Sequence, residues 1–182
     1  MDLIPHLRYM LFVKKTIIVA ISVFIVAIAY GCRNVEVLDD RDRQVKIETM
    51  YRQYAREFPQ VEGITAAELQ QLQQELVLID VRSPEEIAGS RIPGAITAAE
   101  FESNLEQYKD AIAIAYCTIG YRSGLYAQKL QQQGIEVLNL EGSLLAWTHA
   151  GGELIDASGT TNKVHVFGRR WSLTAKDYEP VW

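Results

Sequence analysis

Two short apolar runs constrain the fold of this chain more than any other feature. They read LVLIDV at residues 76–81 and AIAIAY at residues 111–116. Runs of this length and composition are typical of strands buried on both faces of a parallel sheet. A shorter run at 137–140 is a third strand candidate, and a helix pattern follows each run. The chain is therefore predicted to form an α/β domain with a mostly parallel central sheet flanked by helices.

Helix starts are marked by hydroxyl residues with a glutamate three positions later. Such a pair forms a capping box, in which each residue's side chain bonds the other's backbone amide. The pattern predicts helices that open at Thr65, Ser83 and Thr97, the first reaching about Gln74 and the third about Tyr108. Two further helices are expected at 123–133 and 143–150, the first ended by Gly134.

The length of 182 residues fits one domain with extensions. Polar residues 33–43 are typical of a linker, and apolar residues recur at helical spacing over 45–58. The last thirty residues hold one strand candidate, 164–167, and aromatics expected to pack back onto the domain. The predicted division is a signal or membrane segment at 1–31, a linker and amphipathic helix at 32–60, the α/β domain at 61–156 and a C-terminal extension at 157–182.

Composition narrows the possible partners. The formal net charge is −5 and no basic block occurs, which argues against a nucleic-acid partner. Two cysteines and three histidines are too few for a disulfide framework or a convincing zinc site. The two cysteines, Cys32 and Cys117, lie in very different contexts.

The N-terminal region has the pattern of a membrane signal. Residues 16–31 carry no charge and follow Lys14 and Lys15. Sixteen residues of helix span about 24 Å, short of the roughly 30 Å hydrocarbon core, which favours a signal peptide. Met10 is an alternative start that would give a signal of ordinary length.

Residues 29–32, AYGC, resemble a bacterial lipobox, where cleavage before the cysteine accompanies its lipidation. The resemblance makes Cys32 a lipidation candidate, although a lipobox usually has Leu in place of Ala29 and a small residue in place of Tyr30. An uncleaved single-span anchor and a plain cleaved signal remain alternatives. A lipid or a single span would attach the chain to a membrane, with its domain outside the cytoplasm.

The segment CTIGYRS at 117–123 joins a buried strand to a helix. In open α/β sheets ligands bind at this edge, and a tight turn there directs successive backbone amides into an anion-binding concavity. The helix N-terminus adds partial positive charge, so we expect Cys117 to have a lowered pKa. Gly120 permits the tight turn, and Arg122 supplies a fixed cation with several donors.

Three blocks of this sequence resemble the single-domain rhodaneses, a family of sulfurtransferases related to thiosulfate sulfurtransferase. IDVRSPEE at 79–86 is similar to the family's D-V-R-x-x-x-E. GSRIPGA at 89–95 is similar to G-H-I-P-G-A, with Arg91 in place of His and Ser90 as an extra residue. The Cys117 loop is followed by GSLLAW at 142–147, similar to G-G-x-x-x-W with Ser143 in place of the second glycine. The resemblance covers roughly residues 63–155.

The resemblance implies a double displacement through a persulfide on Cys117, with no cofactor or metal. A small anionic donor such as thiosulfate would supply the sulfur, and a thiol or cyanide would accept it. Arg122 would bind the donor, and the loop amides would hold the anionic sulfur; these belong to Thr118, Ile119, Gly120, Tyr121 and Ser123. Asp80 and Arg82 would brace the loop, with Glu86 expected to pair with Arg82.

Other functions remain open from the residues themselves. A cysteine at the end of an apolar strand is often an inert core residue, and a rhodanese-like module can serve as a binding or sulfur-carrier domain without catalysis. Phosphatases and arsenate reductases that share the architecture carry five residues between the cysteine and the arginine of the loop. This chain has four, residues 118–121, which favours a single sulfur atom over a tetrahedral anion. His149 and His165 have no partner nearby in the sequence and are not expected to act as bases.

Overall fold

A computed structural model of the protein describes residues 38–182. The uncharged segment at 16–31 and Cys32, the lipidation candidate, lie outside the described residues. Within residues 38–182, no helix has the length and apolar character needed to cross a membrane.

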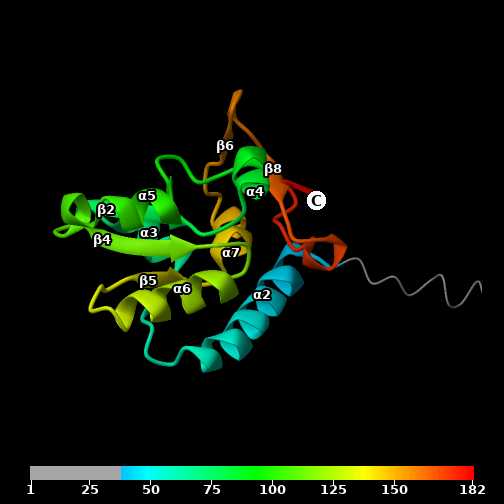
Figure 1. Cartoon of the computed structure of the whole chain (residues 1–182). Coiled ribbons are helices and arrows are strands. Elements are labelled where there is room, and N and C mark those ends of the chain that lie inside the picture. Colours follow the sequence, from blue (N-terminus) through cyan, green and yellow to red (C-terminus); the bar gives the residue numbers. More distant parts are fainter. Residues whose placement is uncertain (1–37) are drawn as a thin grey trace, which may run out of the picture. The chain divides into compact units, whose positions relative to one another are not determined.

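A five-stranded sheet forms the centre of the domain, in the order β1-β5-β4-β2-β3, and every neighbouring pair is parallel (Figure 1). The strands are β1 (Gly63–Ile64), β2 (Leu76–Asp80), β3 (Ile96–Thr97), β4 (Ile112–Tyr116) and β5 (Leu138–Leu140). The predicted parallel α/β architecture is confirmed. Strands β2 and β4 pair from Leu76↔Ile112 to Asp80↔Tyr116, so their carboxyl ends lie side by side at one edge of the sheet.

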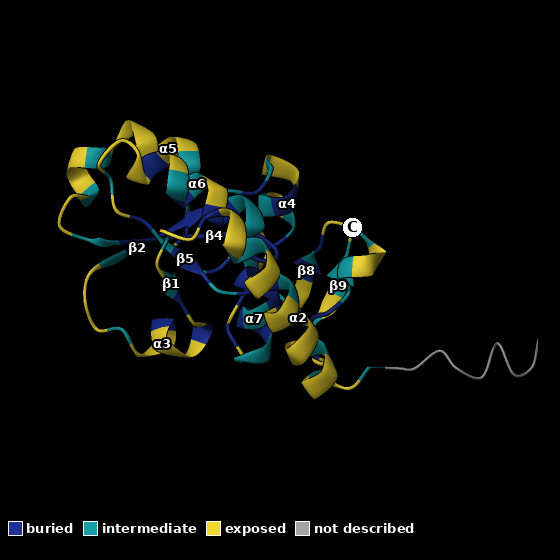
Figure 2. Ribbon diagram, turned by 90° about the horizontal axis from the view of Figure 1, so that it is seen from below, coloured by how far each residue is buried: buried dark blue, intermediate teal, exposed yellow. Residues whose placement is uncertain are grey.

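Helices cover both faces of the sheet. Alternate strand residues point to opposite faces, so Leu78 and Ile114 join one buried cluster whereas Val77 and Ile79 join the other. The first cluster includes side chains of α2 (Asp40–Tyr54), α3 (Ala66–Gln71) and α7 (Ser143–His149). The second includes side chains of α5 (Ala98–Ser103) and α6 (Tyr121–Gln131). In Figure 2 the strands are mostly buried, and the exposed positions lie on the outer sides of the helices.

All three predicted capping boxes are present, at Thr65, Ser83 and Thr97, and they open α3, α4 (Pro84–Gly89) and α5. At Thr97 the backbone amide donates to the Glu100 carboxylate over 2.7 Å, and the Glu100 amide donates back to the hydroxyl over 3.1 Å. The helix ends differ from the prediction: α3 stops at Gln71, and the helix expected to reach about Tyr108 divides into α5 and a 3-10 turn, η2 (Leu105–Tyr108).

The first described helix begins earlier than predicted. Residues 40–43, expected in a linker, form the first turn of α2, which ends at Tyr54 and continues as η1 (Ala55–Glu57). Asp39 caps this helix by accepting a hydrogen bond from the Asp42 amide over 2.8 Å. Acidic residues at a helix N-terminus interact favourably with the helix dipole, so the same charges that suggest a linker stabilise this turn.

The C-terminal residues form small elements of their own. An antiparallel hairpin joins β6 (Ile155–Asp156) to β7 (Gly159–Thr160), and β8 (Lys163–His165) pairs in parallel with β9 (Glu179–Val181). The strand candidate at 164–167 is thus β8, shifted by one or two residues, and a 3-10 turn, η3 (Arg169–Trp171), follows it. Val164, Val166 and Leu173 are buried in the same cluster as the sheet.

Candidate active site

Cys117 is the first residue after β4, and its loop leads directly into α6. The residue is only 1% exposed. Its backbone amide donates to the Ser143 hydroxyl over 3.1 Å, and its carbonyl accepts from the Leu144 amide over 3.2 Å. The start of α7 therefore holds the backbone of Cys117 in place through these two hydrogen bonds.

The sulfur of Cys117 lies among hydrogen-bond donors. The Gly120 amide donates to Sγ over 3.2 Å, and the Ser123 hydroxyl lies 3.6 Å from it. Burial alone raises the pKa of the Cys117 thiol, but the Ser123 amide and hydroxyl, the positive charge of Arg122 and the Gly120 amide outweigh it. The net result is a lowered pKa, which favours the thiolate that nucleophilic chemistry requires.

Gly120 is required at the turn for two reasons. Its φ of +97° lies in the left-handed region, which residues with a Cβ rarely adopt. A Cβ at this position would also lie 2.8 Å from the Tyr51 ring of α2. The loop can thus close tightly over β4 only with glycine at this position.

Asn139, absent from the residues that the sequence predicts for the site, bonds the middle of the loop and its last residue. Its side-chain amide donates to the Gly120 carbonyl over 2.9 Å, and its side-chain oxygen accepts from the Ser123 hydroxyl over 2.7 Å. Asn139 is fully buried in β5. A lone polar residue inside the apolar run 137–140 was the signal that could have found it.

Arg122 and Glu86 form a two-pronged ion pair. Nη1 and Nη2 of Arg122 each lie 2.7 Å from a carboxylate oxygen of Glu86, and Nη2 also donates to the Thr118 hydroxyl over 3.3 Å. Burial raises the pKa of Glu86, but hydrogen bonds from Arg122 and the Ser83 amide, with the charges of Arg122 and Arg82, lower it to about 2. The expected pairing of Glu86 with Arg82 is therefore wrong.

Arg82 is instead paired with Asp80, two residues before it. Nε and Nη2 of Arg82 donate to the two carboxylate oxygens of Asp80 over 2.9 and 2.7 Å, and both side chains are buried. Nη2 also donates to the Ser90 carbonyl, and the guanidinium carbon lies 5.8 Å from the centre of the Tyr116 ring. Because Arg82 donates these two hydrogen bonds to the Asp80 carboxylate, Glu86 forms its ion pair with Arg122 instead.

Ser143, which stands where the rhodanese motif has its second glycine, adopts a φ of +47°. This conformation costs a residue with a Cβ roughly 1–2 kcal/mol. Its hydroxyl accepts from the Cys117 amide and donates to the Leu140 carbonyl over 3.1 Å. The two hydrogen bonds of the serine hydroxyl thus offset the cost of its left-handed backbone, and one of them holds the Cys117 amide.

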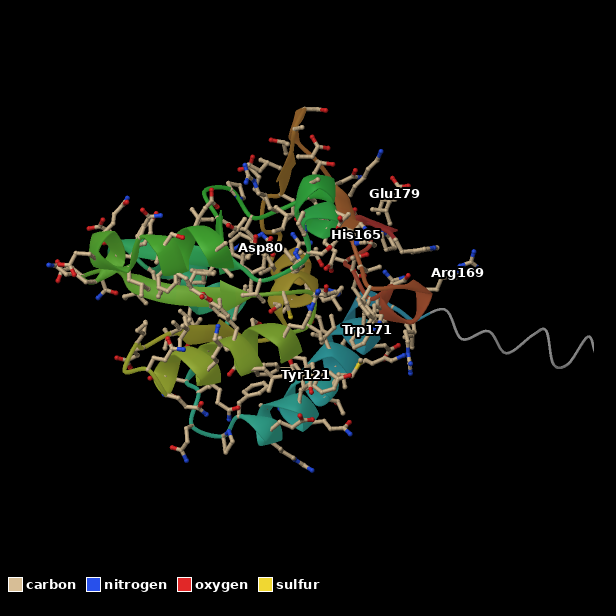
Figure 3. All side chains as sticks on the ribbon, viewed as in Figure 1. Asp80, Tyr121, His165, Arg169, Trp171 and Glu179 are labelled. Atoms are coloured by element: carbon tan, nitrogen blue, oxygen red, sulfur yellow. The ribbon has the colours of Figure 1, made fainter. Side chains whose placement is uncertain are left out.

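A cavity of about 480 Å³ opens above the cysteine loop. Side chains of the loop form its floor: Cys117, Thr118, Ile119, Tyr121 and Arg122. The residues of its walls come from segments before and after the α/β domain predicted at 61–156. They are not among the predicted site residues: Tyr54, Glu57, Phe167 and Trp171. In Figure 3 the labelled side chains of Tyr121 and Trp171, which both line this cavity, are drawn beside α2.

No histidine is among the described residues that line this cavity. Within residues 38–182, no group of three histidine, cysteine, aspartate or glutamate side chains is placed to hold a metal ion. His149 binds the Leu173 carbonyl over 2.8 Å, and His165 packs beside Gly89; neither lines the cavity. The titratable side chains that line the cavity are therefore those of Cys117, Arg122, Glu57, Tyr121 and Tyr54.

Comparison with known proteins adds independent evidence. The family model described as rhodanese-like domain matches residues 65–150. A sulfurtransferase from Allochromatium vinosum is 34% identical over 90 residues, which cover 47% of this chain and 84% of that protein. An uncharacterized protein from Synechocystis is 39% identical over 89 residues, 46% of this chain but only 50% of that protein.

A solved structure supports the same fold. The crystal structure of thiosulfate sulfurtransferase from Pseudomonas aeruginosa matches with a TM-score of 0.51 and 26% identity, covering 69% of this chain and 25% of that one. The motifs, the parallel sheet with a cysteine at the edge formed by its carboxyl ends, and the match to most of a sulfurtransferase agree with one another. This chain belongs to the rhodanese-like family.

Proposed function

We propose that the protein is a sulfurtransferase that moves a sulfane sulfur through a persulfide on Cys117. The observation that carries the proposal is the sulfur of Cys117, held 3.2 Å from the Gly120 amide, with a lowered pKa, at the floor of a cavity. A thiolate in an amide-lined loop is a nucleophile that also stabilises the anion it becomes.

The reaction has two balanced steps. The Cys117 thiolate attacks the outer sulfur of a donor such as thiosulfate, and the bond between the two donor sulfurs breaks with its electron pair, releasing sulfite. An acceptor thiolate or cyanide then attacks the outer sulfur of the persulfide, and Cys117 leaves as a thiolate. No proton needs to be moved by a side chain in either step when the acceptor arrives as an anion.

The surrounding residues have defined parts in this scheme. The Gly120 amide and the amides of the first turn of α6, which have no acceptor within the helix, stabilise the negative charge on sulfur. Arg122 adds a guanidinium beside the loop, and this group is paired with the Glu86 carboxylate. Asn139 and Ser143 are positioning residues that hold the loop and the Cys117 backbone.

Mass spectrometry of the purified protein tests the proposal. Incubation with thiosulfate should add the mass of one sulfur atom, and cyanide or a thiol should remove it. Cys117→Ser should abolish the gain, whereas Cys32→Ser, the matched control at the other cysteine, should retain it. No gain of sulfur in the unaltered protein would favour the second family function, a binding module without catalysis.

We further propose that the domain works outside the cytoplasm, attached to a membrane by its N-terminal region. Lys14 and Lys15, the uncharged residues 16–31 and the lipobox-like step into Cys32 support this placement. In an oxidising compartment a second free cysteine would trap the nucleophile as a disulfide, and lipidation of Cys32 would remove that competitor.

A further inference from the structure

The cavity above Cys117 is enclosed by segments that lie outside the family match. Tyr54 and Glu57 come from α2 and η1, before residue 65, whereas Phe167 and Trp171 come from the segment around η3, after residue 150. The rhodanese core thus provides the nucleophile, and the flanking segments provide the walls around whatever molecule reaches it.

The walls are ordered and largely aromatic. The ring of Tyr54 lies 5.0 Å from that of Tyr121 and 6.4 Å from that of Trp171, so the three rings form one continuous surface. The Tyr121 hydroxyl donates to the Glu57 carboxylate over 3.1 Å, which fixes the ring across the cavity. All three rings pack against the main buried cluster, so the surface exists before any ligand binds.

The charges at the cavity disfavour a small dianion. The positive charge of Arg122 is matched by the two-pronged bond to Glu86, and Phe167 lies over the guanidinium at 5.8 Å. Glu57 adds a carboxylate to the wall without a cationic partner among the contacts of the described residues. Inorganic thiosulfate carries two negative charges and is repelled by the net negative charge of the groups at the cavity. An organic monoanion carries half that charge, so it is repelled less, and it also gains contact with the aromatic rings.

We propose that Tyr54, Glu57, Trp171 and Tyr121 form a specificity pocket for the organic part of the sulfur compound. The substrate class is an organic thiosulfonate with an apolar aromatic or aliphatic substituent. This inference rests on the proposed function. For a thiosulfonate, the Cys117 thiolate takes the outer sulfur, the sulfur–sulfur bond breaks with its electron pair, and a sulfinate leaves; charge and atoms balance as for thiosulfate.

Steady-state kinetics of the full-length protein test the pocket with two donors, benzenethiosulfonate and inorganic thiosulfate. The ratio of their kcat/KM values should favour the aryl donor. Trp171→Ala and Tyr54→Ala should each lower this ratio by about tenfold, because each removes an aromatic contact. Trp182→Ala is the matched control: this ring is exposed, stacks on Arg169 and does not line the cavity, so the ratio should not change.

Glu57→Gln tests the charge separately and avoids the risk that removal of a packed ring unfolds the domain. Glutamine keeps an acceptor for the Tyr121 hydroxyl but removes the negative charge. This change should raise kcat/KM for thiosulfate severalfold and that for benzenethiosulfonate less. A wild-type ratio that favours thiosulfate, or a ratio unchanged in Trp171→Ala and Glu57→Gln, would overturn the pocket.

Binding without turnover separates this inference from the proposed function. Benzenesulfinate, the leaving group of the aryl donor, should bind Cys117→Ser in calorimetry and bind more weakly after Trp171→Ala is added. Such binding supports the pocket even if the wild-type protein transfers no sulfur. Sulfur transfer without any sulfinate binding would overturn the pocket and leave the proposed function intact.

Discussion

The guanidinium of Arg122 and the carboxylate of Glu86 meet as two parallel hydrogen bonds of 2.7 Å, joining the first turn of α6 to the first turn of α4. Glu86 also accepts from the Ser83 amide over 3.0 Å and so completes the cap of its own helix. One carboxylate therefore holds both the start of α4 and the guanidinium that lies beside the Cys117 loop.

Replacement of Glu86 by glutamine should destabilise the domain. Glutamine can still cap α4, but it offers Arg122 a single uncharged acceptor. Because the Arg122 side chain is about one third exposed, we expect a loss of only about 1–2 kcal/mol in the free energy of unfolding. Urea denaturation checks this. Glu85→Gln, an exposed neighbour in the same turn without an ion pair to Arg122, is the control and should lower the midpoint less than Glu86→Gln does.

The same pair predicts how stability depends on pH. The pKa of Glu86 is about 2 in the folded protein, below its ordinary value of 4.5, so the folded state binds the proton less readily than the unfolded state. The stabilisation is complete above about pH 4.5 and is lost as the pH falls toward 2. Between pH 6 and pH 3, the urea midpoint of the wild-type protein should therefore fall further than that of Glu86→Gln. Equal losses would exclude this carboxylate as a source of acid sensitivity.

Arg122→Ala should raise the KM for thiosulfate by about tenfold, since a charge-assisted hydrogen bond contributes about 1.5–3 kcal/mol. Arg122→Lys should recover little of this loss, because an ammonium group cannot form the planar fork that Glu86 accepts. Initial rates over a range of thiosulfate concentrations measure the effect. Unchanged kinetics in both variants would reduce Arg122 to a structural ion-pair residue.

Ser123→Ala should raise the pKa of Cys117, because the hydroxyl that helps to lower it is removed while burial still favours the neutral thiol. The pH dependence of thiolate absorbance, followed in a Cys32→Ser background so that only one thiol titrates, would measure the shift. Ser103→Ala, an exposed serine in α5, serves as the control and should leave the titration in place. A titration that Ser123→Ala does not move would remove Ser123 from the site.

Cys32→Ser should distinguish the two modes of membrane attachment. Under lipidation this change blocks processing and leaves a longer precursor in the membrane fraction; under an uncleaved span it alters neither the processing nor the location. Mass analysis of the native N-terminus gives the answer directly. An unprocessed protein recovered from the cytoplasm would contradict both modes.

The site was only partly predictable. The Cys117 loop, with Gly120 and Arg122, is a continuous stretch whose spacing marks it in the sequence. Asn139 and Tyr54 act on that loop from elements far along the chain. Asn139 is marked only as a lone polar residue in an apolar run, and no local pattern separates Tyr54 from ordinary helix residues. The partner of Glu86 was mispredicted because Arg82 is nearer in sequence, whereas Arg122 is nearer in space.

Patterns within short stretches of the sequence predict the main elements and single out Cys117 as the candidate nucleophile. Apolar runs, capping residues and a tight loop depend on contacts within a few residues, so they mark β2, β4, the starts of α3, α4 and α5, and Cys117. The tertiary structure alone decided which charges pair and what encloses the cysteine. Arg122 meets Glu86 across 36 positions, and Tyr54 meets Trp171 from opposite sides of the core sequence. Such contacts arise only when the sheet brings distant segments together, and the periodicity of no single segment encodes them.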